Sequence, residues 1–198
     1  MSEAVLPLFP LGTVLFPGGP LALRIFEPRY LDLVRRCMRE QAPFGVVLIL
    51  EGLEAGPVAA LATTGTSARL TDFDTRPDGL LGIACRGERR FRVARRWQQR
   101  DGLHLAEVDY LPPAAPRTLP PELAHLGAEL RAVLARLDGP FAQLETHYED
   151  AGWVANRWAE ILPLAPAHKQ ALLELAEPLA LLEEVAAWLA RQPPAAHV

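Results

Sequence analysis

The chain has 198 residues, of which 50 % are hydrophobic and 22 % are charged, and it carries a net charge of −4. This length and hydrophobic content are enough for one medium domain or two small ones with a buried core. The acidic balance disfavours a protein built chiefly to neutralise phosphate backbones. No stretch reaches the ~18 apolar residues of a membrane span, and the N-terminus lacks the features of a signal peptide, which predicts a cytoplasmic protein without a membrane partner.

The first half of the chain, from Val5 to about Tyr110, reads as short β-strands separated by glycine, proline or charged residues. One helix interrupts them and is expected from Pro28 to Gln41, because apolar residues recur there at helical spacing and proline suits a first turn. This helix should cap an opening of the sheet. The clearest strands are expected at Leu21–Phe26, Phe44–Leu50, Leu80–Arg86, Arg89–Trp97 and Leu103–Tyr110.

The second half of the chain follows a proline-rich segment. Five prolines lie within Leu111–Pro121, and they mark a domain boundary because proline lacks the amide hydrogen that strands and helix interiors need. We therefore expect a β domain over 1–112 and a helical domain over 113–198. Leucines at helical spacing predict a helix from Leu123 to Leu137 that stops at a glycine and a proline. Further helices are expected at 141–148, 152–162, 166–176 and 179–191.

Three motifs near the N-terminus follow one another in a recognisable order. They are Leu-Pro-Leu-Phe-Pro-Leu at 6–11, Val-Leu-Phe-Pro-Gly at 14–18 and Ile-Phe-Glu-Pro-Arg-Tyr at 25–30. Further motifs continue in register at Phe44–Val47, Gly65–Thr66, Pro77–Gly79, Gly87–Val93, Leu162–Leu164 and within 169–174. Over nearly its whole length the chain resembles the N-terminal, substrate-binding domain family of Lon proteases. The resemblance implies an α+β fold, with a PUA-like β pseudobarrel that carries an inserted helix and is followed by a C-terminal helical bundle.

The sequence lacks the signals of the ATPase and peptidase modules that complete a Lon protease. No Gly-x-x-x-x-Gly-Lys-[Ser/Thr] phosphate loop is present, and neither Ser2 nor Ser67 stands in a nucleophile motif. We therefore expect a free-standing, non-catalytic module that uses no cofactor. The resemblance implies that it binds unfolded polypeptide or a protein partner, as an adaptor in protein quality control.

A peptide-binding surface needs exposed apolar groups, because unfolded substrates offer apolar segments. The candidates for such a surface are Phe16, Pro17, Phe26, Tyr30 and Phe91, together with Arg29. The competing interpretation is that most of these side chains hold the barrel together.

An arginine-rich strand is the other candidate binding feature. Seven arginines lie within residues 86–100, opposed in that segment by Glu88 alone. Strand alternation places Arg90, Arg92 and Arg96 on one face, opposite an apolar face. This pattern fits a strand with a solvated outer side, and it leaves open the binding of an acidic protein segment. It also leaves RNA or another nucleic acid as the alternative partner, since PUA-like folds bind RNA elsewhere.

Two acidic segments superficially resemble metal sites. In a calcium loop starting at Asp72, the third ligand position is Arg76, the required glycine is Pro77 and the closing acid is Ile83, so a hairpin turn is expected at 72–79 instead. Glu145, His147, Glu149 and Asp150 cluster near the start of an expected helical turn. On a helix His147 would project roughly opposite to Glu145, because residues two apart point in roughly opposite directions. No metal site is therefore expected.

Overall fold

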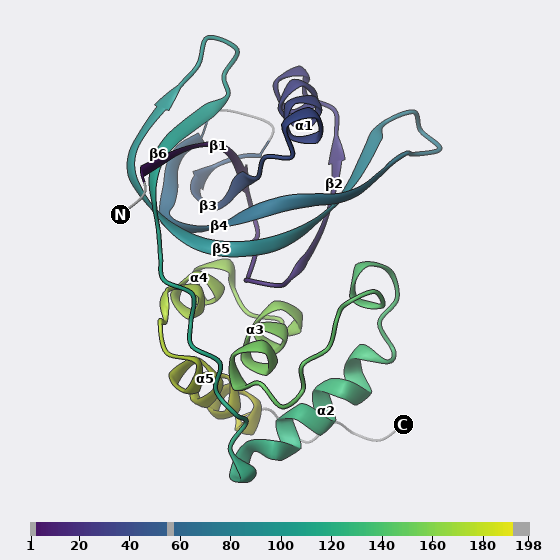
Figure 1. The fold of residues 1–198 in the computed structure, drawn as a ribbon, viewed down its shortest axis with the longest axis vertical. Helices are drawn as coiled ribbons and strands as arrows, with labels where there is room; N and C mark the ends of the chain where they lie inside the picture. The colour runs from purple at the N-terminus through teal and green to yellow at the C-terminus, as the bar shows by residue number, and fades with distance from the viewer. Residues whose placement is uncertain (1–2, 55–57, 192–198) are drawn as a thin grey trace.

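The computed structural model describes residues 3–54 and 58–191, which form a ring-like β pseudobarrel followed by helices (Figure 1). The sheet has the strand order β2-β5-β4-β3-β1-β6, and a further pairing of β5 with β6 closes the ring. β1 and β3 run parallel, and all other neighbours are antiparallel. The strands are β1 (Glu3–Leu11), β2 (Pro20–Ile25), β3 (Phe44–Gly52), β4 (Val58–Thr75), β5 (Leu81–Gln98) and β6 (His104–Tyr110). The predicted α+β pseudobarrel is confirmed.

β5 is one continuous strand, where the sequence predicts two shorter ones with a break near Gly87. The glycine serves a different purpose, because the loop before β2 approaches it closely. Gly18 N donates to Gly87 O at 2.8 Å, and Gly87 N donates to Gly19 O at 2.9 Å. A Cβ atom on Gly87 would collide with the carbonyl oxygen of Phe16. The predicted break was wrong because glycine in a strand can mark the close approach of another backbone.

β1 is a strand that the prolines in its sequence obscure. Residues Glu3–Leu8 pair with β6, whereas Leu8–Leu11 pair with β3. Apart from Leu8, each residue of β1 in these pairings therefore has a neighbour on one side only. Pro7 and Pro10 are tolerated there, since proline lacks only the amide hydrogen and edge positions leave one side unpaired.

α1 (Pro28–Glu40) lies beside β2 and covers one opening of the barrel, as predicted (Figure 1). Its apolar face is buried in a cluster with residues from β1, β3 and β5. The helix ends at Gln41, whose φ of 52° lies in the left-handed region and whose side chain caps Met38 O. The amphipathic pattern and the N-terminal proline were sufficient to locate this helix.

The helices follow a segment without regular structure that descends from β6 along the helical part (Figure 1). The helical elements are η1 (Pro121–Leu123), α2 (Ala124–Leu134), η2 (Gly139–Phe141), α3 (Ala151–Ile161), α4 (Pro166–Glu174) and α5 (Pro178–Ala190). The helices predicted at 123–137, 152–162, 166–176 and 179–191 are thereby confirmed with small shifts of their ends.

The helix predicted at 141–148 is wrong, because that segment contains only the end of η2 and then an irregular stretch. The residues that follow it, up to Asp150, are held in an extended conformation by hydrogen bonds to the proline-rich segment. Leu119 N donates to Glu149 O at 2.7 Å, and Ala151 N donates to Arg117 O at 2.8 Å. These tertiary hydrogen bonds compete with helical ones and outweigh local propensity.

One of three buried hydrophobic clusters is shared between the barrel and the helices. Val14, Phe16, Leu48 and Ala62 of the barrel belong to the same buried cluster as the inner faces of α2, α3, α4 and α5. Gln170 of α4 also donates from Nε2 to Thr64 O of β4 at 3.1 Å. The division at 112 marks where β-structure gives way to helices, and the assignment of 1–112 and 113–198 as two domains stays a prediction.

Candidate functional site

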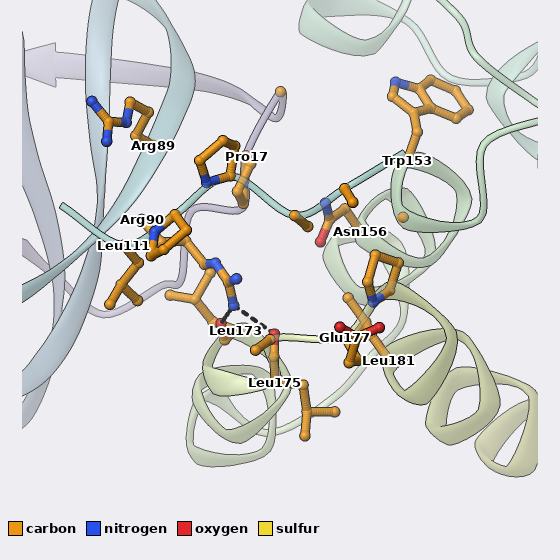
Figure 2. A pocket seen from close by; sticks show the side chains of 18 of the residues that line it. Pro17, Arg89, Arg90, Leu111, Trp153, Asn156, Leu173, Leu175, Glu177 and Leu181 are labelled. Carbon is orange, nitrogen blue, oxygen red and sulfur yellow. Dashed lines mark hydrogen bonds between the residues drawn. The ribbon is translucent and has the colours of Figure 1, made fainter. Parts of the chain in front are cut away.

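An open cavity of about 340 Å³ lies at the junction between the barrel and the helices (Figure 2). Its barrel side is formed by Pro17, Gly18 and residues 88–90 of β5. The proline-rich segment 111–116 forms a second wall, and the N-terminal part of α3 and the α4–α5 connection form the third. Five segments far apart in the sequence thus meet around one space.

Arg90 fixes the barrel to the end of α4 at one side of this cavity. Its Nη1 donates to Leu173 O at 2.9 Å and to Leu175 O at 2.5 Å (Figure 2). These are carbonyl groups at a helix C-terminus, which have no intrahelical partner. Burial lowers the pKa of Arg90, as expected for a cation moved out of water. Arg90 therefore holds the junction together, which contradicts its predicted place on a solvated face.

The proline-rich segment supplies a wall of unpaired backbone. Leu111 N donates to Arg90 O at 2.9 Å, and Arg117 N donates to Asp150 Oδ2 at 3.3 Å. Between these anchors, residues 112–116 make no backbone hydrogen bond to another described residue. The three prolines cannot donate, so the N–H groups of Ala114 and Ala115 and the intervening carbonyls remain for a ligand or water.

Asn156 provides the polar side chain that faces this space (Figure 2). It is half-buried on α3, and no hydrogen bond joins its amide to another described residue. A side-chain amide donates and accepts at once, which matches the two hydrogen-bonding groups of a peptide unit. Trp153 lies one helical turn earlier, and the exposed carboxylate of Glu177 lies across the cavity. Neither Asn156 nor Glu177 stands in a sequence pattern that signals a site.

The structure distributes the predicted apolar candidates over several places. Phe16 and Phe91 are 0 % exposed and Tyr30 is 5 % exposed, so these three side chains are packed in the core. Pro17 lines the junction cavity. Phe26 is 57 % exposed, but it lies on the other side of the barrel beside α1.

Arg29 is engaged in local structure. Its Nη2 lies 2.7 Å from Glu27 Oε2, and its Nη1 donates to Gly102 O at 3.0 Å. The guanidinium also lies 4.8 Å from the centre of the Tyr30 ring. These contacts join the start of α1 to the β5–β6 turn.

The predicted arginine face does not exist, because β5 contains a bulge between Val93 and Arg95. Arg92 lies opposite Asp109 on β6, whereas Arg96 lies opposite Ala106, which is completely buried. Opposed residues of an antiparallel pair share a face, so Arg92 and Arg96 are on different faces. Arg92 and Arg96 remain exposed, but with Arg90 engaged at the junction they form no continuous cationic stripe.

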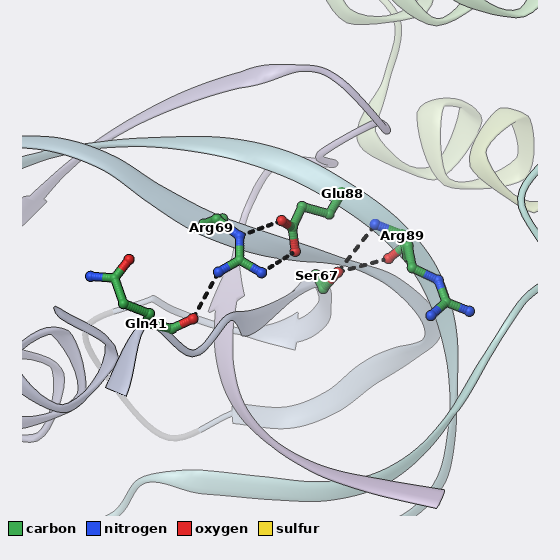
Figure 3. A network of polar contacts seen from close by, with 5 residues as sticks. All are labelled: Gln41, Ser67, Arg69, Glu88 and Arg89. Atoms are coloured by element: carbon green, nitrogen blue, oxygen red, sulfur yellow. Dashed lines mark hydrogen bonds and ion pairs between the residues drawn. The ribbon is translucent and has the colours of Figure 1, made fainter. Parts of the chain in front are cut away.

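Polar contacts between β4 and β5 explain the neighbouring charges (Figure 3). Glu88, the one acidic residue within 86–100, pairs with Arg69 of β4, and Arg69 Nη1 donates to Gln41 O at 2.7 Å. Ser67 Oγ accepts from Arg89 N at 3.1 Å and donates to Arg89 O at 3.2 Å. Ser67 is 1 % exposed, so its hydroxyl bridges an irregular part of the ladder and is not presented as a nucleophile.

A buried ion pair supports the loop that carries Pro17. The Nε atom of Arg157 lies 2.8 Å from Glu160 Oε2, and its Nη2 donates to Pro17 O at 2.9 Å. Lys169 Nζ donates to Glu160 O at 2.6 Å. Burial raises the pKa of Glu160 to about 7, although Arg157 opposes the shift. Gly19 must lack a side chain here, because a Cβ atom would collide with the Glu160 carboxylate.

The raised pKa of Glu160 predicts a pH-dependent stability. The folded protein binds this proton more tightly than the unfolded chain, whose Glu has a pKa of 4.5. The stabilising contribution is therefore complete below pH 4.5 and is lost as pH rises towards 7. Relative to Glu160→Gln, the wild type should lose on the order of 2–3 kcal/mol of unfolding free energy between pH 5 and 8. Urea denaturation of both proteins at each pH measures this difference, and parallel curves would contradict the assignment.

The described part of the chain holds no group of three or more His, Cys, Asp or Glu side chains suited to a metal ion. The segment 145–150 is irregular, and the Nε2 atom of His147 lies 3.6 Å from Glu145 Oε1. Residues 75–80 form the expected hairpin turn, with Gly79 at φ 80°. Among residues 3–54 and 58–191, no helix combines the length and apolar character needed to cross a bilayer.

These features define a class of protein: an α+β domain in which helices pack against a six-stranded pseudobarrel and leave an open cavity at the junction. The family model of the ATP-dependent protease La (LON) substrate-binding domain matches residues 5–191. The chain therefore belongs to the Lon substrate-binding domain family.

Curated relatives are full Lon proteases. The Lon protease of Phenylobacterium zucineum is 28 % identical over 200 residues, and that of Paraburkholderia phytofirmans is 28 % identical over 197 residues. These alignments cover 97 % and 93 % of this chain, but 25 % and 24 % of the relatives. The chain thus spans about a quarter of their length, and it corresponds to the domain family and not to the ATPase or peptidase parts.

Solved structures show the same architecture. A Lon N-terminal domain protein from Xanthomonas campestris is 40 % identical with a TM-score of 0.78, and the match covers 93 % of this chain and 98 % of that one. The N-terminal domain of the Mycobacterium avium complex Lon protease is 18 % identical with a TM-score of 0.64, covering 96 % and 100 %. The second similarity concerns the fold alone.

Proposed function

We propose that this chain is a non-catalytic polypeptide-binding module, and that it takes extended segments of unfolded protein or of a protein partner into the junction cavity. The observation that carries the proposal is the open cavity itself, which combines apolar walls with an unpaired side-chain amide at Asn156. Membership of a substrate-binding domain family supports a protein ligand. An adaptor role in quality control and residence in the cytoplasm are part of the same proposal.

The chemistry of the walls suits a peptide in an extended conformation. Pro17 and the exposed rings of Pro112, Pro113 and Pro116 offer apolar surface to side chains, and burying such surface is favourable. The amide of Asn156 can pair with one peptide unit of the ligand. The free backbone of residues 112–116 offers further acceptors along the same wall. Affinity would then come from main-chain recognition together with apolar contact, with little dependence on ligand sequence.

We expect Asn156→Ala to weaken polypeptide binding by about 10-fold, since one or two neutral hydrogen bonds contribute roughly 1 kcal/mol each. The measurement is fluorescence anisotropy with a labelled, reduced and carboxymethylated polypeptide that cannot fold. Gln143→Ala is the matched control, because it removes the same amide at an exposed position outside the cavity. Ala176→Trp should block the cavity by bulk, since Ala176 is exposed on its wall.

The same titration at low and high salt, repeated with a labelled RNA oligomer, separates the alternatives. Binding to the polypeptide that tolerates salt and falls in both cavity variants supports the proposal. RNA binding alone, with log affinity falling by about 0.7–0.9 per contacted phosphate as log salt rises, would replace it with the nucleic-acid function. If both Asn156→Ala and Ala176→Trp bound the polypeptide as the wild type does, the polypeptide would bind outside the junction cavity.

A further inference from the structure

β2 forms a free edge of the sheet, because β5 is the one strand paired with it in the described chain. The hydrogen bond from Gly87 N to Gly19 O shows which residues of β2 direct their backbone N–H and C=O groups towards β5. Paired and unpaired orientations alternate along an antiparallel strand, so Leu21 and every second residue after it face β5. Pro20 belongs to the alternate residues, which face away from β5, and this suits a residue that has no N–H to donate. The backbone groups of Ala22 and Arg24 therefore point away from the sheet.

A second cavity of about 370 Å³ lies along this edge. Residues 22–26 of β2 and the turn after it form one wall. Phe9, Leu11 and Tyr30 form the apolar part of the remaining lining, and Glu27, Glu54 and Arg76 form its charged part. The Phe9 and Tyr30 rings are stacked at 3.9 Å. Phe26, exposed at 57 %, lies where β2 ends.

We propose that an extended segment of another polypeptide adds to β2 as a further strand and places an apolar side chain in this cavity. The outward N–H and C=O groups of Ala22 and Arg24 supply the main-chain hydrogen bonds. Successive side chains of a strand point to opposite faces, so every second ligand residue would face the barrel. This inference rests on the proposed function for the nature of the partner, but it assigns a site separate from the junction cavity.

A second copy of this chain is a poorer occupant than an unfolded segment. Leu21, Leu23 and Ile25 already pack into the core beneath β2, and Ile25 is 2 % exposed. A paired β2 would therefore bring no free apolar side chain to the cavity. Arg24, which forms an ion pair with Asp78, is a charge on the exposed edge, and such charges discourage edge-to-edge self-association. An unfolded polypeptide carries apolar side chains that are not yet committed to a core.

The test removes one N–H group on the free edge of β2 and leaves the pairing of β2 with β5 intact. Ala22→Pro deletes the N–H that points away from β5, and proline is tolerated at such positions of edge strands. Ala22→Val is the matched control, because it keeps the N–H and favours a strand. We expect Ala22→Pro to weaken binding of the labelled, carboxymethylated polypeptide by about 10-fold, and Ala22→Val to bind as the wild type does. Circular dichroism verifies that both variants are folded.

Hydrogen exchange in the wild type provides a second measurement that needs no variant. The amides of Ala22 and Arg24 should exchange about 10-fold more slowly when the polypeptide is added, with the N–H of Leu23 as an internal reference already paired to β5. Unchanged exchange at both amides would overturn the inference, as would self-association of the wild type that Ala22→Pro abolishes.

The two sites can be told apart by their variants. Binding that falls in Ala22→Pro but not in Asn156→Ala would support strand addition and refute the junction cavity as the site. The reverse result would refute strand addition and leave the proposed function standing. A wild type that binds no polypeptide would refute both.

Discussion

Replacing Arg157 with methionine should destabilise the protein by about 3–5 kcal/mol at pH 8, because the Glu160 carboxylate would be left buried without its counter-charge. Arg157 is 0 % exposed, and its guanidinium also holds the carbonyl of Pro17. Both interactions disappear in Arg157→Met. Chemical denaturation followed by circular dichroism measures the loss, which should be smaller at pH 5, where Glu160 is protonated.

The double variant Arg157→Met/Glu160→Met is the control for this prediction. Replacing both members of a buried ion pair with apolar residues of similar size is often neutral or stabilising. The double variant should therefore recover most of the stability that the single variant loses. A single variant that loses less than about 1 kcal/mol would show that the pair is solvated, contrary to its burial in the structure.

Replacing Phe91 with alanine should cost about 3–5 kcal/mol of unfolding free energy, as expected for a large aromatic side chain removed from a packed core. Phe91 is 0 % exposed and packs in a cluster with Leu6, Leu8 and Val47. Its ring also meets that of Tyr110 edge-on at 6.5 Å. Urea denaturation measures the stability, and polypeptide binding is measured at a temperature at which the variant remains folded.

Phe26→Ala is the matched control, because Phe26 is the candidate phenylalanine that is exposed. Its removal should change stability by no more than about 0.5 kcal/mol, as is usual for surface substitutions. If Phe91→Ala kept normal stability but lost polypeptide binding, its place as a core residue would be refuted. Reduced stability with normal affinity in the folded variant would agree with the packing observed.

The elements that the sequence predicted well are those governed by short-range patterns. α1 was located from helical spacing and an N-terminal proline, and α3, α4 and α5 from repeated apolar positions. The motifs near the N-terminus indicated the family and, with it, the pseudobarrel. Predictions failed where distant segments outweigh local preference, as at Gly87 and in the segment after η2.

The sequence by itself determined that a β half precedes a helical half, and its motifs indicated the family and, with it, the fold class, because helical spacing, turn residues and motifs are local patterns. Only the tertiary structure decided the role of Arg90, whose partner Leu173 lies 83 residues away. It also decided that Phe91 is core, that a bulge divides the arginine face, and that Asn156 faces an open cavity. Burial, strand register and the convergence of remote segments are properties of packing, and alternation along one strand cannot specify them.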